Sequence, residues 1–350
     1  GTYALDANTT AQQSVAIGYQ ALSANTTQGY NTAVGALAGR DNTTGEGLTA
    51  IGHVALVKNT TGNYNTACGY DCLGEVTTSS NNTGVGYFAL RNNTSGSEMT
   101  AMGVQALEAN TSGGANTAFG FRALQTCTTG SNNVAVGYET LDALTTGTEN
   151  VAMGVGALGA MTTSTNTVAL GHGALKAVTT GSHNVGTGMD CGQLITTGNY
   201  NVVIGRRAGS SITTGTRNVC IGPTAGLDQV STADNLLYIA RGSGAAGNAD
   251  VWIRGDGSGN CIQGSNSTSW DTTSDRRLKK NIVESTKGLD EIDQLRVTNF
   301  KYRTEDEIDM SEFPLADKPD QVCLGKGRED QIQTGVIAQE VEAVLPECIK

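Results

Sequence analysis

The apolar and polar residues of this chain follow a pattern that returns every 17 positions. The segments "ANTAFGFRAL" (115–124), "NNVAVGYETL" (132–141) and "ENVAMGVGAL" (149–158) are three successive copies of it. Threonine lies eight residues after the central glycine in twelve of thirteen copies, and leucine lies four residues after it in nine. A fixed period of this kind indicates a repeat architecture. The glycine recurs without interruption at positions 18, 35, 52, 69, 86, 103, 120, 137, 154, 171, 188, 205 and 222.

Each copy predicts one short strand and one turn. Gly, Thr and Asn are poor helix formers, and a single copy is too short for a helical hairpin. The segment "NTAVG" (31–35) fits a strand, and "TTG" or "NTTG" fits a turn. The sequence therefore predicts a mainly β fold, a parallel β-solenoid (β-roll) of about thirteen coils over residues 1–226. At a strand spacing of ~4.8 Å, these coils make a rod of roughly 60 Å.

The strand of each coil is apolar on both faces. The residue two positions before the repeat glycine is small, as in Ala33, and the residue one position before it is larger, as in Val34 and Phe119. Adjacent strand residues point to opposite faces, so the small row suits the narrow interior and the large row is expected outside. An uncovered apolar row favours intertwined or side-by-side association of copies, most simply a parallel homotrimer. Alternatively, leucines such as Leu22 and Leu56 cover this row within one chain.

Charge divides the chain unevenly. Residues 1–273 contain 26 charged side chains, and the much shorter stretch 274–350 contains 29. This shift predicts a domain boundary near Ser274, and hence a rod at 1–226, a β-structured neck at 227–273 and a terminal domain at 274–350. The net charge of −11 argues against a nucleic-acid partner. No apolar run approaches the roughly 18 residues of a membrane helix, so no membrane insertion is expected.

Neither the histidines nor the cysteines of the rod predict a metal site or a cofactor. His53 and His172 occupy the position after the repeat glycine, where Tyr or Phe stands in other copies, and they lie seven coils apart, on the order of 34 Å. We interpret both as members of a ladder of rings. The eight cysteines form no C-x-x-C pair, and Cys72 and Cys191 stand where other copies have alanine. Most cysteines are therefore interpreted as small apolar residues in a reducing cytoplasm.

Two further motifs are attributed to turns. The glycosylation-type triplets at Asn25, Asn42, Asn59 and Asn110 recur because the turn recurs, so they carry no information about modification. The "RGD" triplet at 254–256 is interpreted as a hairpin turn rather than as an integrin ligand.

The segment after the rod predicts three short strands, "LLYIA" (236–240), "DVWIR" (250–254) and "NCIQ" (260–263), separated by Gly/Ser turns. Its aromatic residues Tyr238, Trp252 and Trp270 are either receptor contacts or residues packed at a trimer axis, and the second interpretation is preferred.

The terminal domain predicts a mixture of helix and strand. "TKGLDEIDQL" (286–295) and "IAQEVEAVL" (337–345) fit helices, and "VTNFKYR" (297–303) fits a strand. Ser274 precedes Lys279 by five positions, and a lysine can activate a serine by accepting its proton. A serine that caps a basic helix start is the alternative at this spacing.

Two families resemble parts of the chain. Copies such as "QSVAIGYQAL" (13–22) and "NTVALGHGAL" (166–175) are similar to the head repeats of trimeric autotransporter adhesins and to arrays in virus tail-fibre-like proteins. The resemblance implies a trimeric, rod-like surface module. "SDRRLKKNI" (274–282) with "GVIAQEVE" (335–342) resembles the intramolecular chaperone at the carboxyl end of endosialidases, phage tail spikes and tail fibres. That family implies a small α+β domain that trimerises, templates the rod and cuts itself off.

The second resemblance also implies a site. Ser274 is the expected nucleophile, Lys279 is its partner, and the cleaved bond joins Thr273 to Ser274. Supporting positions of the two motifs are Asp275, Arg277, Asn281, Ile282, Gln339 and Glu340. The chain stops at Lys350, before the long helix that such domains usually have, so this copy is expected to be incomplete, and the sequence runs unbroken through the expected cut.

These observations predict a trimeric virion fibre, assembled in a host cytoplasm, that attaches the particle to a host surface. Its expected partners are two further copies, a glycan or protein receptor, and other virion proteins at the amino end. Its only expected chemistry is a single self-cleavage, without cofactor or metal. A cellular adhesin or filament at the cell surface is the alternative. A glycan-degrading tail spike is less favoured, because paired carboxylates do not recur along the rod.

Overall fold

A computed structural model describes residues 1–226, 231–242, 251–255, 257–258, 261–263, 297–300 and 333–336. The chain divides into two compact units, Gly1–Trp270 and Asp271–Lys350. Each unit is described by itself below. No helix occurs in these described ranges, and hence none that is long and apolar enough to cross a membrane.

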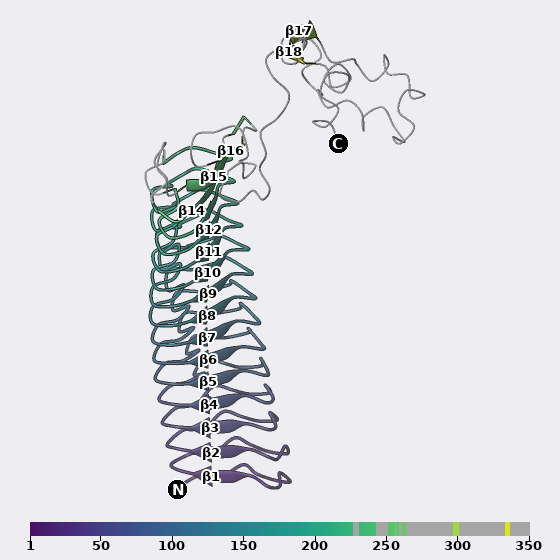
Figure 1. Cartoon of the computed structure of the whole chain (residues 1–350). Helices are drawn as coiled ribbons and strands as arrows, with labels where there is room; N and C mark the ends of the chain where they lie inside the picture. Colours follow the sequence, from purple (N-terminus) through teal and green to yellow (C-terminus); the bar gives the residue numbers. More distant parts are fainter. Residues whose placement is uncertain are drawn as a thin grey trace, which may run out of the picture. The chain divides into compact units, whose positions relative to one another are not determined.

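The first unit is a parallel β-solenoid, which confirms the fold predicted from the repeat (Figure 1). Every strand from β1 to β12 pairs in parallel with the next, and paired residues are one repeat apart, as in Ala16 with Ala33. Each coil contributes one three-residue strand. These strands are β1 Val15–Ile17, β2 Thr32–Val34, β3 Thr49–Ile51, β4 Thr66–Cys68, β5 Thr83–Val85, β6 Thr100–Met102, β7 Thr117–Phe119, β8 Val134–Val136, β9 Val151–Met153, β10 Val168–Leu170, β11 Val185–Thr187, β12 Val202–Ile204 and β13 Val219–Ile221.

The solenoid sheet continues into the predicted neck. Strand β14 (Leu237–Ala240) pairs in parallel with β13, but it is displaced along the sequence by a single residue from the repeat, since Val219 lies opposite Leu237 rather than Leu236. Strands β15 (Val251–Gly255) and β16 (Cys261–Gln263) then add in antiparallel fashion. The three strands predicted here are confirmed, and they belong to the same sheet as the rod rather than to a separate one.

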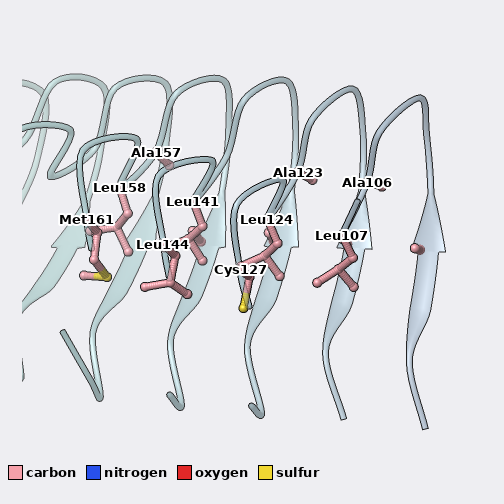
Figure 2. Close-up of a cluster of buried hydrophobic side chains, with 14 of the residues drawn as sticks. Ala106, Leu107, Ala123, Leu124, Cys127, Leu141, Leu144, Ala157, Leu158 and Met161 are labelled. Carbon is pink, nitrogen blue, oxygen red and sulfur yellow. The ribbon is translucent and has the colours of Figure 1, made fainter. Parts of the chain in front are cut away.

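The interior of the coils is filled by two kinds of small or medium apolar side chain. The alanines two residues before the repeat glycine are buried, and so are the leucines four residues after it, such as Leu124 and Leu141. Figure 2 shows these leucines directed inward beside Cys127, Leu144 and Met161. The leucines therefore do not cover the outer row, and that alternative is wrong.

The backbone of each coil explains why the repeat glycine never changes. Its φ lies between +114° and +150° in all thirteen coils, a region that only glycine adopts readily. A Cβ atom at Gly154 would also lie 2.5 Å from the carbonyl oxygen of Gly171 and 2.6 Å from its carbon. Successive coils thus approach each other through their glycine backbones, and any side chain at this position would separate them.

Ladders of side-chain hydrogen bonds join successive coils at their turns. The hydroxyl of the threonine eight residues after the repeat glycine donates to the carbonyl oxygen of the equivalent residue in the next coil, as from Thr145 to Thr162 at 3.0 Å. A second ladder is buried. Asn133 Nδ2 donates to Asn116 Oδ1 at 3.1 Å and to Gly147 O at 2.9 Å. These bonds satisfy buried polar groups that would otherwise destabilise the coil.

In the second unit, the described residues form one antiparallel pair, β17 (Val297–Phe300) with β18 (Gln333–Val336). The strand predicted at 297–303 is confirmed over its first four residues. The helices predicted at 286–295 and 337–345 lie outside the described residues.

Candidate functional site

The outward face of the solenoid sheet is largely apolar along the rod, with threonine in one of its rows over six successive coils. We call it the outer stripe: it consists of residues 15, 17 and 19 and of the equivalent residues of every later coil, ending at 219, 221 and 223. Its middle row is the large row one residue before the repeat glycine. Ile17 is 59% exposed and Met153 is 50% exposed, so the sequence correctly placed this row outside the coil.

One edge of the outer stripe is a row of rings. The rings of His53 and Tyr70 stack with centroids 5.5 Å apart, and those of Tyr70 and Tyr87 stack at 5.4 Å. Phe121 and Tyr138 stack at 5.2 Å further along. His53 therefore belongs to a ring ladder, as predicted.

His172 differs from His53. Its sequence neighbours in the same row are Val155 and Met189, and its Nδ1 lies 3.8 Å from Asp190 Oδ1, so the prediction of a ring ladder is wrong at this position. In the described part of the chain, no group of three or more His, Cys, Asp or Glu side chains could hold a metal ion.

The cysteines of the rod fall into two classes. Cys72, Cys127, Cys191 and Cys220 are buried, and burial raises the pKa of their thiols to about 11 for Cys127 and to about 12 for the other three. At neutral pH these thiols remain protonated and unreactive. Cys68 is different, because it lies in the middle row of the outer stripe and is partly exposed.

The glycosylation-type asparagines are interior residues. Asn25, Asn42, Asn59 and Asn110 are all fully buried. Asn42 Nδ2 donates to Asn25 Oδ1 at 2.8 Å, and Asn59 Nδ2 donates to Asn42 Oδ1 at 2.9 Å. The amides of Asn25, Asn42 and Asn59 are thus parts of an internal ladder, whereas the amide of Asn110 is buried without a hydrogen-bond partner. None of the four is accessible in the folded rod.

The sequence analysis missed the other buried ladder, which lies four residues before the repeat glycine. Asparagine occupies this position in nine of thirteen coils, for example at Asn116, Asn133 and Asn150. The regularity was visible in the sequence, but this asparagine was treated only as the first residue of the predicted strand, as in "NTAVG" (31–35), and no ladder was predicted from it. An asparagine that recurs immediately before the strand, rather than within the turn triplet, is the signal that distinguishes the two roles.

The described aromatic residues of the neck differ in exposure. Tyr238 is buried in the apolar core of its own unit, so both interpretations given for it are wrong. Trp252 is 60% exposed, and its interpretation stays a prediction. Arg254 and Gly255 are the last two residues of strand β15 and pair with Ile262 and Cys261 of β16, whereas Asp256 of the "RGD" triplet lies outside the described residues. Trp270 lies outside the described residues.

The predicted self-cleavage site lies outside the described residues, including Thr273, Ser274 and Lys279 and the supporting positions Asp275, Arg277, Asn281, Gln339 and Glu340. The second motif is partly described. Its first residues, Gly335 and Val336, belong to β18 and pair with Thr298 and Val297 of β17. Gln339 and Glu340 therefore follow, in the sequence, shortly after a strand that is held in an antiparallel pair.

Comparison with known proteins identifies the terminal domain. Residues 274–350 match the family model of the chaperone of endosialidase. No curated protein and no solved structure matches the chain. This domain, with a solenoid of short coils of equal length before it in the sequence, fits a tail-fibre or endosialidase-like protein.

Proposed function

We propose that this chain, with an endosialidase-type chaperone domain behind a solenoid rod, is the subunit of a trimeric virion fibre that attaches the particle to a host surface. The observation that supports this most strongly is the family match at residues 274–350. The rod supplies length and stiffness, because its coils are joined by backbone ladders without interruption from β1 to β14. Its receptor is a glycan or protein of the host surface, and its amino end joins other virion proteins.

Trimerisation follows from the same domain, since the endosialidase chaperone domain implies three chains. A physical need supports it. Successive coils are nearly equivalent in sequence, so chains that assemble along their rods can slip by a whole coil. A trimerising domain at one end fixes the relative height of the three chains before the rods assemble.

The terminal domain then cuts itself off between Thr273 and Ser274. The Ser274 hydroxyl attacks the carbonyl carbon of Thr273 while the neutral Lys279 amine accepts the hydroxyl proton. Lys279 then passes this proton to the Ser274 nitrogen, which leaves as a free amine when the C–N bond breaks and an ester remains. Water hydrolyses the resulting ester, which gives a carboxylate at Thr273 and restores the hydroxyl. The supporting residues Asp275, Arg277, Asn281, Gln339 and Glu340 position these groups. Release of the domain makes unfolding of the assembled rod irreversible, because the template for refolding is gone.

Labelling by antibody tests the location and the role together. Gold-conjugated antibodies against residues 1–226 are expected to decorate fibres on purified virions, and their Fab fragments are expected to reduce adsorption of the virus to host cells. Fab fragments against an unrelated virion protein serve as the control. Gold on the envelope of uninfected cells, with none on virions, would instead identify a cellular adhesin or filament.

A further inference from the structure

We propose that the outer stripe is the surface on which copies of this chain pack, parallel and at equal height, with the middle row facing its own equivalents. This inference rests on the proposed trimer and adds to it the contact face, the orientation and the register.

The chemistry of the outer stripe favours burial. Its three rows of thirteen positions contain no Asp or Glu, and Arg206 is their only Lys or Arg. Ion pairs of the rod lie elsewhere in the coil, such as Lys58 Nζ with Glu75 Oε2 at 2.6 Å and Arg91 Nε with Asp71 Oδ2 at 2.7 Å. Apart from Arg206, this face therefore has no Asp, Glu, Lys or Arg along the rod, while many large apolar side chains on it are 36–59% exposed. A surface of this size and composition marks an interaction site.

The repeat selects a second copy as the occupant. The outer stripe presents the same three positions once per coil, at the ~4.8 Å spacing of neighbouring strands. A partner that covers the outer stripe along about 60 Å needs side chains at the same spacing. The outer stripe of another copy has this spacing because it has the same repeat. In a cyclic trimer whose rods lie along the axis, symmetry makes the rods parallel and places equal residues at equal height.

The middle row also distinguishes one height from another. Most rows of the repeat are nearly uniform, so they do not oppose a slip by one coil. The middle row is uneven, since Phe119 stands between Met102 and Val136, and the polar Thr187 stands between Leu170 and Ile204. A slip by one coil would place the polar Thr187 of one copy against the apolar Leu170 or Ile204 of another, whereas at equal height the Thr187 hydroxyls meet one another. The row thus favours the register in which like layers meet.

Cys68 allows a test without altering the rod. It lies in the middle row between Ile51 and Val85, its paired residues in the neighbouring strands. The other described cysteines of the rod are buried inside the coil. The full chain is treated with a short bifunctional maleimide, and its thiol-linked peptides are identified by mass spectrometry. The expected product is a Cys68–Cys68 link between copies, lost in Cys68→Ser.

Two further variants distinguish the alternatives. Ser112→Cys in the Cys68→Ser background places a thiol on an exposed residue outside the outer stripe and is expected to give no link between copies. Leu170→Cys tests orientation, because an antiparallel pair centred on Phe119 would bring residue 170 opposite Cys68. A trimer without the Cys68–Cys68 link, or with equal linking at residue 112, would overturn the assignment of the face and leave the proposed fibre intact. Links between residues 68 and 170 would overturn the parallel orientation. A monomer would overturn the proposed function itself.

Discussion

Gly154→Ala is expected to abolish cooperative folding of the rod at a temperature where Gly156→Ala remains folded. Gly154 is a repeat glycine with φ of +128°, and an added Cβ would lie 2.5 Å from the carbonyl oxygen of Gly171. Neither the backbone of this coil nor that of the next can move without breaking the ladder on both sides. We expect a loss of about 3 kcal/mol or more in the free energy of unfolding, from backbone strain together with the clash.

Gly156 supplies a matched control in the same coil. Its φ is +63°, and nothing lies within 4 Å of the position that a Cβ would take. The equivalent residues Gln105, Arg122 and Glu139 adopt the same left-handed conformation with full side chains. Alanine here is expected to cost about 1 kcal/mol. Thermal unfolding followed by circular dichroism measures both variants, and equal midpoints would show that the close approach of the glycine backbones does not hold the coils together.

Asn133→Ala is expected to destabilise the rod by about 3–5 kcal/mol, because it leaves several buried polar groups without partners. The side chain is fully buried. Its Nδ2 donates to Asn116 Oδ1 and to Gly147 O, and its Oδ1 accepts from the backbone and side-chain nitrogens of Asn150, each at 3.0 Å. Alanine would remove all four hydrogen bonds and leave a cavity in the corner of the coil.

The preceding residue is the control for this substitution. Asn132 is exposed, with φ of +59°, and Ala115 holds the equivalent position one coil earlier at φ of +53°. Asn132→Ala is therefore expected to change the free energy of unfolding by less than about 1 kcal/mol. Denaturant unfolding of the two variants gives the comparison, and an Asn133→Ala protein as stable as Asn132→Ala would contradict a structural role for the buried ladder.

The sequence predicted the coil and its outer face because both depend on the period alone. A constant spacing determines which residues stack, and the alternation around Ala33 and Val34 determines which of them points inward. The sequence did not determine whether Leu22 and its equivalents point into the coil or away from it. Residues after the repeat glycine include left-handed backbone conformations, and the alternation of side chains along a strand does not apply to them. Only the structure shows that these leucines point inward.

Which asparagines are buried was harder to predict from the sequence, for a physical reason. The same residue type serves as a turn former in solvent and as a buried hydrogen-bonding group, and composition does not separate the two. Asn132 is exposed and Asn133 is buried, although they are adjacent and identical. For Ser274 and Lys279, the five-residue spacing alone is weak evidence for a catalytic pair. The assignment of self-cleavage to them depends on the longer motif in which they stand. The family match at 274–350 supports that assignment, and their roles remain a proposal.

Native mass spectrometry of the complete recombinant product, beside Ser274→Ala, tests the trimeric, self-processing fibre most directly. One chain has a mass of 36.0 kDa. We expect the parent to form an assembly of three chains that each end at Thr273, and Ser274→Ala to form an assembly of three uncut chains. Monomers in both samples would contradict the fibre. Three uncut chains in both would retain the fibre and contradict the cleavage assigned to Ser274.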